Sequence, residues 1–126
     1  MSFATDGLVT DGVSRALHSA LNGVALRQST IADNIANVDT PGYRARAVAF
    51  EDSLRSALVS GAFEVPGADP VVATAALTET PVGPDGNSVD LRKETLAAVQ
   101  SQFQYQMLTR AVSDKFDLVR TAVTGQ

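Results

Sequence analysis

The only histidine in the 126-residue chain, His18, is the first candidate for catalysis. A nucleophile needs a base within hydrogen-bond reach and a third group that orients this base. On a helix, His18 would have Ser14 and Asn22 as neighbours one turn away on either side. Side chains along one straight helical face do not converge on a point, so we expect His18 to be a surface or seam-edge residue without a catalytic role.

Acidic residues and metal ligands offer no better basis for chemistry. Asp114 and Asp117 are three residues apart, but Lys115, Arg110 and Arg120 accompany them, as on a solvated charged helix face. The chain has no Cys, which removes disulfides, thiolate metal ligands and Cys nucleophiles together. The sequence contains neither a zinc-binding helix motif nor a phosphate-binding Gly-rich loop. We therefore predict no enzyme activity, no metal, no cofactor and no small-molecule substrate.

The composition favours long helices that pack closely on each other or on partners. Hydrophobic residues make up 44% of the chain, but 19 of them are Ala and 15 are Val, and only 6% of all residues are aromatic. Because burial stabilises by about 25 cal/mol per Å², such small side chains support only a modest core. The net charge of −4, with scattered signs, predicts no nucleic-acid partner. No uncharged apolar run approaches the roughly 20 residues of a membrane span.

Residues 11–38 show the pattern of an amphipathic helix that stops at a turn. Gln28 interrupts a heptad pattern of apolar residues, which are Leu17, Leu21, Val24, Ile31, Ile35 and Val38. Thr10 or Asp11 would cap the start of this helix. Thr40 precedes Pro41, which disfavours the helical conformation, and Pro41-Gly42 fits the central positions of a type II turn.

Residues 90–123 predict a second, longer helix with two apolar stripes. One stripe contains Leu96, Val99, Phe103 and Met107, and the other contains Tyr105, Leu108, Val112, Phe116, Val119 and Val123. Asp90 is a suitable N-cap and Gly125 a suitable terminator. We predict that the two helices pack along a seam of Leu17, Leu21, Val24, Ile31 and Ile35 against Leu96, Val99, Phe103, Leu108, Val112, Phe116 and Val119. One chain cannot cover both stripes, and an exposed apolar stripe marks an interaction surface.

The chain between the helices carries weaker signals. Residues 43–50 alternate as in an extended segment, and residues 51–59 could form two helical turns. Residues 61–88 hold four of the five Pro and no periodicity, so we expect a flexible loop there. The expected fold is mainly α, with the long terminal helices packed as an antiparallel, coiled-coil pair. It forms one domain, divided at 1–39, 40–60, 61–88 and 89–126.

Asn34 and Asn37 flank Ile35 near the end of the first helix, although Asn is a mediocre helix former. They would either face solvent at a fraying helix end or form interhelical hydrogen bonds that fix register, as polar residues do in coiled coils. The residue pattern alone leaves both interpretations open.

The segment from Ile31 to Tyr43 resembles the signature of the bacterial flagellar axial proteins, the family of rod, hook and hook-associated proteins. An N-terminal helix in that family ends in Ala-Asn-x-x-Thr-Pro-Gly-Tyr, and the signature residues here are Asn34, Ala36, Asn37, Thr40, Pro41, Gly42 and Tyr43. Residues 44–50, 87–90, 105–106 and 115–116 resemble the proximal rod proteins in particular. Ser101 and Arg92-Lys93 depart from the family pattern. The sister rod protein is the alternative within the family, but it usually departs from Thr-Pro-Gly-Tyr at this turn.

The resemblance implies a structural subunit of the flagellar rod, the drive shaft that crosses the cell envelope. Terminal helices in that family pack as the innermost tube of the assembly, which favours the interhelical interpretation of Asn34 and Asn37. The implied partners are further copies of the chain, other rod proteins and the proteins that join the rod base to the MS ring. Export through the flagellar type III apparatus without signal cleavage agrees with residues 1–12, which carry two Asp and no basic residue.

One further implication of the resemblance, and one alternative to it, concern export. Phe50 and Leu54 match the short Phe-x-x-x-apolar element that the export gate recognises in rod and hook subunits, although core packing of a short helix would explain them equally. The alternative function is a helical-hairpin adaptor or chaperone of the export system. Such a protein would form a discrete complex in the cytoplasm, whereas a rod subunit would occur in the basal body.

Overall fold

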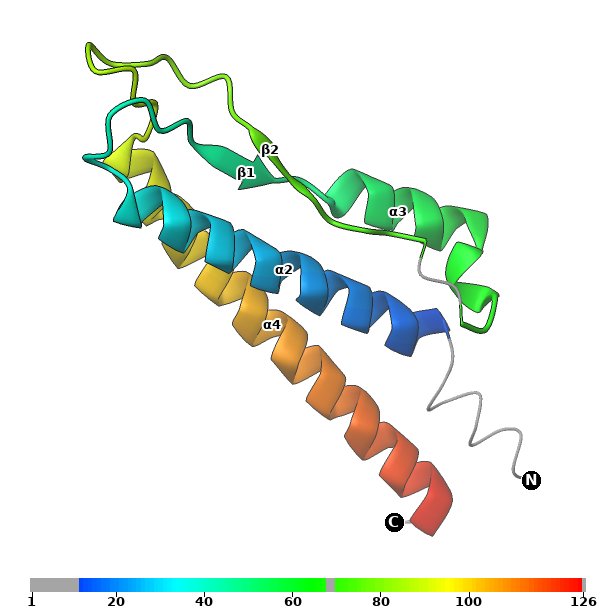
Figure 1. The fold of residues 1–126 in the computed structure, drawn as a ribbon. Coiled ribbons are helices and arrows are strands. Elements are labelled where there is room, and N and C mark those ends of the chain that lie inside the picture. Colours follow the sequence, from blue (N-terminus) through cyan, green and yellow to red (C-terminus); the bar gives the residue numbers. More distant parts are fainter. Residues whose placement is uncertain (1–11, 68–69, 126) are drawn as a thin grey trace.

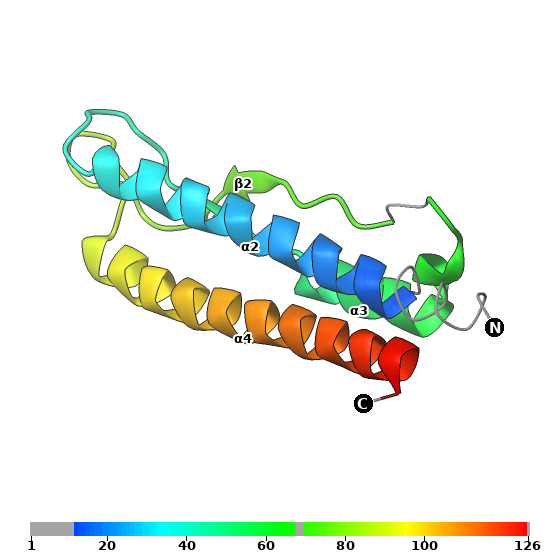
Figure 2. The ribbon, with the colours of Figure 1, turned by 90° about the horizontal axis from the view of Figure 1, so that it is seen from below.

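The computed structural model describes residues 12–67 and 70–125, in which two long helices lie side by side. Helix α2 spans Gly12–Ala36 and helix α4 spans Leu91–Thr124. Figures 1 and 2 show that these helices run antiparallel, as predicted. Between them in sequence come strand β1 (Arg46–Val48), helix α3 (Glu51–Ser60), the 3-10 turn η1 (Ala62–Glu64) and strand β2 (Ala75–Leu77). Helix α2 contacts all of these elements and α4 as well, so it forms the middle layer of the molecule.

Local signals set the ends of the helices where the sequence predicted them. Beyond α2, the amide of Tyr43 donates to Thr40 O at 3.2 Å, and Gly42 has a φ of +76°, as a type II turn requires. The carboxylate of Asp90 accepts hydrogen bonds from the amides of Arg92 and Lys93 and so caps the start of α4. Gly125 ends α4 in the left-handed conformation, with a φ of +75°. The predicted caps of the first helix, Thr10 and Asp11, lie outside the described residues.

The hydrophobic core lies between α2 and the layer formed by β1, α3 and η1. Its buried members are Ala16, Ala20, Val24, Val48, Phe50, Ala57, Phe63 and Val71. Helix α2 contributes only two Ala and one Val to this cluster, and Phe50 and Phe63 are its largest members. Gly23 makes room for one of them, because a Cβ at this position would lie 2.6 Å from Cδ1 of Phe50.

The seam between α2 and α4 differs from the predicted one on the α4 side. Leu96, Val99, Phe103 and Phe116 were expected in the seam, but their exposed fractions are 59%, 50%, 62% and 68%. Buried or half-buried residues of α4 instead recur at alternating steps of three and four, and they include Glu94, Ala97, Ser101, Gln104, Leu108, Ala111 and Lys115. Small and polar residues therefore form most of this seam, together with the half-buried Val112 and Val119. The predicted α2 residues are buried (Val24, Ile31) or half-buried (Leu17, Leu21, Ile35).

Residues 61–88 contain regular structure where the sequence predicted only a loop. Strand β2 pairs antiparallel with β1, in a register that places Arg46 opposite Leu77. Phe63 and Val71 are only 2% and 6% exposed and belong to the core. The segment obtains its order from β1 and α2, far away in sequence, which explains why it shows no periodicity of its own.

Within the part of the chain that the structure describes, no helix is both long and apolar enough to cross a membrane.

Replacing Gly23 with Ala tests the close packing of α2 on Phe50. Ala is the better helix former by about 1 kcal/mol, but the ring of Phe50 is buried and leaves no room for the methyl group. We expect Gly23→Ala to lower the free energy of unfolding by about 2 kcal/mol, measured by urea denaturation. The neighbouring Asn22→Ala, on the exposed side of α2, is the control and should be neutral or slightly stabilising. Stabilisation by both substitutions would contradict the packing described.

Candidate assembly interface

One side chain, that of Asn34, ties three elements together at the end of α2. Asn34 is fully buried, with an exposed fraction of 0%. Its amide nitrogen Nδ2 donates to Arg46 O of β1 at 2.7 Å and to Oε1 of Glu94 on α4 at 2.6 Å. Its oxygen Oδ1 accepts from Arg46 N at 3.1 Å and from the hydroxyl of Tyr43 at 3.5 Å. The interhelical hydrogen bond that the sequence left open is therefore present within a single chain.

The amide of Asn34 acts on β1 as a peptide group of a further strand would. It accepts from the N–H and donates to the C=O of the same residue, Arg46. Further along the strand, Val48 O accepts from Nε and Nη2 of Arg27 at 3.1 and 2.6 Å. Strand β1 thus has β2 on one side and side chains of α2 on the other, and these side chains pair with both backbone groups of Arg46 and with the carbonyl of Val48.

Asn37 makes only local contacts through its side chain. Nδ2 donates to Asp33 O at 2.8 Å, and Oδ1 accepts from the hydroxyl of Thr40 at 3.0 Å. These bonds finish the last turn of α2, where backbone carbonyls lack helical partners. The two Asn of the signature therefore have different roles, one long-range and one local.

The turn after α2 is bound to the segment that precedes α4. The amide of Asn87 donates to Asn37 O at 2.8 Å and to Thr40 O at 2.7 Å. Backbone bonds add to this contact, from Gly42 N to Asp85 O at 2.9 Å and from Ser88 N to Tyr43 O at 3.0 Å. Further along, Ser88 Oγ accepts from Ala45 N at 2.8 Å. We call this contact of residues 34–46 with residues 85–94 the signature junction.

The signature residues lie at this junction, but not all are buried in it. Asn34 is buried and Asn37 and Tyr43 are half-buried, whereas Ala36, Thr40, Pro41 and Gly42 are exposed. The sequence pointed to residues 87–90 through the family resemblance and through Asp90 as a helix cap, but it predicted no contact between these residues and the turn after the first helix. The sequence feature that could have indicated this contact is the pair of polar residues Asn87 and Ser88, which lies directly before the cap of the second helix.

Glu94 is an acidic residue buried between α4 and the end of α2, with an exposed fraction of 7%. This burial raises the pKa of its carboxyl group above the ordinary value of 4.5, and the hydrogen bond from Asn34 partly offsets the effect. The junction therefore contains a carboxylate whose charge is costly in the folded chain.

A second polar cluster, around Arg27, joins α2 to α3 and α4. Arg27 forms an ion pair with Glu51 at 2.6 Å and donates to Oε1 of Gln104 at 2.9 Å. Its guanidinium also lies over the ring of Phe50, 4.9 Å from the ring centroid. The hydrogen bond from Arg27 lowers the pKa of Glu51 to about 2.

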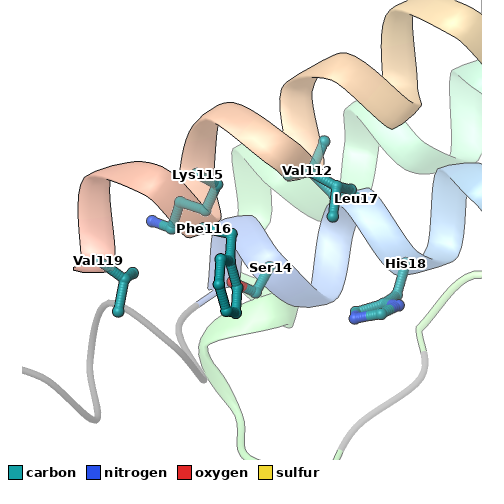
Figure 3. Close-up of a pocket in the computed structure, with 7 residues that line it drawn as sticks. All are labelled: Ser14, Leu17, His18, Val112, Lys115, Phe116 and Val119. Atoms are coloured by element: carbon teal, nitrogen blue, oxygen red, sulfur yellow. The ribbon is translucent and has the colours of Figure 1, made fainter. Parts of the chain in front are cut away.

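The opposite end of the molecule holds an apolar cavity of about 200 Å³ between the start of α2 and the end of α4. Figure 3 shows the residues that line it, which are Ser14, Leu17, His18, Val112, Lys115, Phe116 and Val119. The only histidine thus lies beside apolar side chains, on the exposed side of α2. Among the described residues, no group of three His, Asp or Glu side chains could hold a metal ion.

Four large apolar side chains project from α4 on the side away from α2. Leu96, Val99, Phe103 and Met107 are 59%, 50%, 62% and 65% exposed. They recur at steps of three and four residues and so follow one face of the helix. Arg92 and Arg110, both exposed, lie on the same face at its two ends. We call these six residues the outer face of α4.

Proteins of similar sequence identify the family. A family model described as flagella basal body rod protein matches residues 15–44, which run from α2 into the signature junction. The flagellar basal body rod protein FlgB of Bacillus subtilis is 31% identical over 122 residues, which cover 90% of this chain and 95% of the relative. The chain belongs to the FlgB family of flagellar basal body rod proteins.

Other FlgB proteins agree with this assignment. Those of Salmonella typhimurium and Escherichia coli are 36% and 34% identical over 113 and 119 residues. These matches cover 77% and 82% of this chain, and 82% and 86% of the relatives. Because the matches extend over most of each FlgB chain, the similarity includes more than the N-terminal signature.

Replacing each signature Asn with Ala separates their two roles. Asn34→Ala leaves the N–H and C=O of Arg46 and the carboxylate of Glu94 without this partner in a buried site. We expect a loss of about 3 kcal/mol in the free energy of unfolding, measured by urea denaturation at pH 7. Asn37→Ala removes only local bonds at a half-buried site and should cost about 1 kcal/mol or less. Equal losses for both variants would argue against the long-range role of Asn34.

Glu94 and Glu51 should give opposite pH profiles. The raised pKa of Glu94 means that its contribution to stability is fully present below about 4.5 and falls as pH rises through the folded-state pKa. Glu94→Gln should therefore gain stability relative to the parent chain as pH increases above 4.5. The pKa of Glu51 is lowered to about 2, so its contribution is present above 4.5 and is lost as pH falls towards 2. Glu51→Gln should accordingly lose stability at neutral pH.

Thermal unfolding of both variants between about pH 3 and about pH 8 checks these profiles, because this range lies on both sides of the ordinary carboxyl pKa. A Glu94→Gln variant that is less stable than the parent at neutral pH would show that the charge of Glu94 is well accommodated.

Proposed function

We propose that this chain is a non-enzymatic structural subunit of the flagellar rod and polymerises through its terminal helices into the drive shaft that transmits motor torque. The observation that carries this proposal is the outer face of α4. Its four apolar side chains are each at least half exposed on a helix whose opposite face already packs on α2. Membership of the FlgB family supplies the setting in which such a face would be covered.

An apolar face of this kind needs a partner. Soluble monomers seldom expose several large apolar side chains in one continuous stripe, and such stripes mark protein–protein contacts. In a rod whose subunits all point the same way along the axis, this face meets a different surface of the neighbouring copy, because pairing with itself would need a two-fold axis. Contacts between two different surfaces generate rings or, when they do not close, helical filaments. This geometry suits a rod.

The proposal includes the partners and the location that the family suggests. We propose contacts with further copies of the chain, with other rod proteins and with the proteins at the junction of rod base and MS ring. The corresponding location is the basal body within the cell envelope, reached through the type III export apparatus without signal cleavage. Support comes from the names of the relatives, each a flagellar basal body rod protein.

Recognition by the export gate would require an unfolded chain around β1 and α3. Phe50, the first residue of the proposed gate element, is 4% exposed and lies beneath the guanidinium of Arg27. Leu54 is half-buried and packs against the same core. A gate that binds both side chains can therefore do so only before the chain folds. The observed core packing is also what the alternative interpretation of these two residues expects.

Polar substitutions on the outer face of α4 test the proposed polymerisation. Leu96→Gln and Phe103→Gln introduce a good helix former and remove exposed apolar surface. The free energy of unfolding of the isolated chain should therefore stay within about 0.5 kcal/mol of the parent. In a strain of the source bacterium that lacks the native gene, the double variant should fail to form rods and motile cells. Ser113→Gln, an exposed change on α4 away from this face, is the matched control and should restore both.

Electron microscopy of isolated basal bodies and swimming assays provide the measurements. Normal rods with the double variant, at normal protein levels, would show that the outer face of α4 does not hold the subunits together.

A further inference from the structure

We propose that the outer face of α4 in one copy packs against the outer face of α2 in a second copy, with Arg92 opposite Asp33. This inference rests on the proposed function and names the surface that covers the apolar stripe. The outer face of α2 consists of exposed, small residues at alternating steps of three and four, namely Asn22, Ala25, Ser29, Ala32 and Ala36.

Helix α2 has three distinct faces, and the chain itself occupies two of them. One face is buried against β1, α3 and η1, and the second packs on α4. The third carries no exposed side chain larger than Asn between residues 22 and 36, and Asp33 lies at its edge. Because its side chains are small, a neighbouring helix can approach the α2 backbone closely. The large side chains of the outer face of α4 would then fit between the small ones, as knobs fit into holes in a coiled coil.

Charges at the ends of the two faces are complementary. Arg92 begins the outer face of α4, and Asp33 lies at the edge of the outer face of α2 near its C-terminal end. Both side chains are exposed, and within the described residues neither forms an ion pair or a side-chain hydrogen bond. Asp39 adds a second exposed carboxylate beyond α2, and no basic side chain accompanies it on residues 28–43. The acidic end of one face would therefore meet the basic end of the other.

The symmetry of a helical assembly determines the direction of this contact. All copies point the same way along the axis of such an assembly. Since α2 and α4 are antiparallel within one copy, α4 also meets the α2 of a neighbour in antiparallel orientation. This orientation brings the N-terminal end of α4 to the C-terminal end of α2, so Arg92 reaches Asp33, and the opposite ends of the two helix dipoles also lie together.

The same register matches the apolar side chains to the small ones. With Arg92 opposite Asp33, Leu96 lies opposite Ser29, between Ala25 and Ala32, and Phe103 lies opposite Asn22, next to Ala25. Within one copy, by contrast, Glu94 on α4 lies opposite Asn34 on α2. The neighbour is therefore shifted by three residues, or about 4.5 Å along the helix axes at 1.5 Å per residue.

Cysteine cross-linking tests the contact directly, because the chain has no native Cys. Leu96→Cys and Ser29→Cys in one chain place one thiol on each proposed face, and both positions are exposed. Leu96 points away from α2 of its own chain, so a disulfide between the two forms only between copies. After mild oxidation of basal bodies we expect a ladder of covalent oligomers in steps of the 13.2 kDa chain. The pair Ser113→Cys with Ser29→Cys, which moves one thiol off the outer face of α4, should give no ladder.

Intact rods without a ladder for the Leu96–Ser29 pair would overturn this inference and leave the proposed function in place. A single cross-linked product with a different protein would likewise overturn it, since the neighbour would not be a second copy. The proposed function is tested separately, by whether the double variant Leu96→Gln and Phe103→Gln still forms rods.

Charge reversal provides an independent test that does not depend on Cys variants assembling. Arg92→Glu and Asp33→Arg should each abolish motility, and the two together in one chain should restore it, because the pair is reversed at every contact. Both changes place a charge favourable to its helix dipole, so neither should unfold the isolated chain. Full motility with either single change, or no recovery with both, would contradict the proposed pairing of Arg92 with Asp33.

Discussion

The fold depends on how the inner edge of a three-residue strand is satisfied. Strand β1 pairs with β2 on one side only, and a two-stranded ladder this short is marginal by itself. Its other edge faces α2, where water does not reach and an unpaired peptide group would be costly. The amide of Asn34 pairs with both backbone groups of Arg46 and also reaches Glu94 on α4. One side chain of α2, that of Asn34, thus fixes the positions of β1 and α4 relative to α2.

This arrangement explains how a chain with few large side chains holds a defined shape. The faces that α2 buries are lined mostly by Gly, Ala and Ser, and one of these, Gly23, lets Phe50 pack directly on the helix. The α2–α4 seam is also built largely from small and polar residues, among them the fully buried Ser101. Close approach and hydrogen bonds therefore replace much of the apolar volume. The large side chains that remain on α4 are left on the surface, where they can stabilise contacts between chains rather than within one.

The helix ends were predictable from the sequence because they depend on neighbouring residues. Strand β2 and the α4 seam were not, because they depend on contacts between residues far apart in the chain. Asp90, Pro41-Gly42 and Gly125 act on their own neighbours, so their effects follow from residue type and position. Strand β2 has three residues and no periodicity, and only its pairing with β1 orders it. The predicted α4 seam was right for the half-buried Leu108, Val112 and Val119, but its other four members are exposed. An apolar pattern shows that a helix face will be covered, but it does not show which partner covers it. No local pattern predicted the burial of Glu94 and Ser101, since it depends on the neighbouring α2, from which Asn34 donates a hydrogen bond to Glu94.

The family model matches residues 15–44, which begin in α2 and end at the turn bound by Asn87. Most residues of this stretch must satisfy a specific contact. One side of α2 must stay small for Phe50, another must fit α4, and its end must supply the amide that pairs with β1. If the third side receives a neighbouring copy, almost no position on the helix is free of contact. Helix α4 packs mainly on α2 within one chain and adds hydrogen bonds from Gln104 to Glu51 and from Lys93 to Thr80, so more of its surface can vary with the partner it meets.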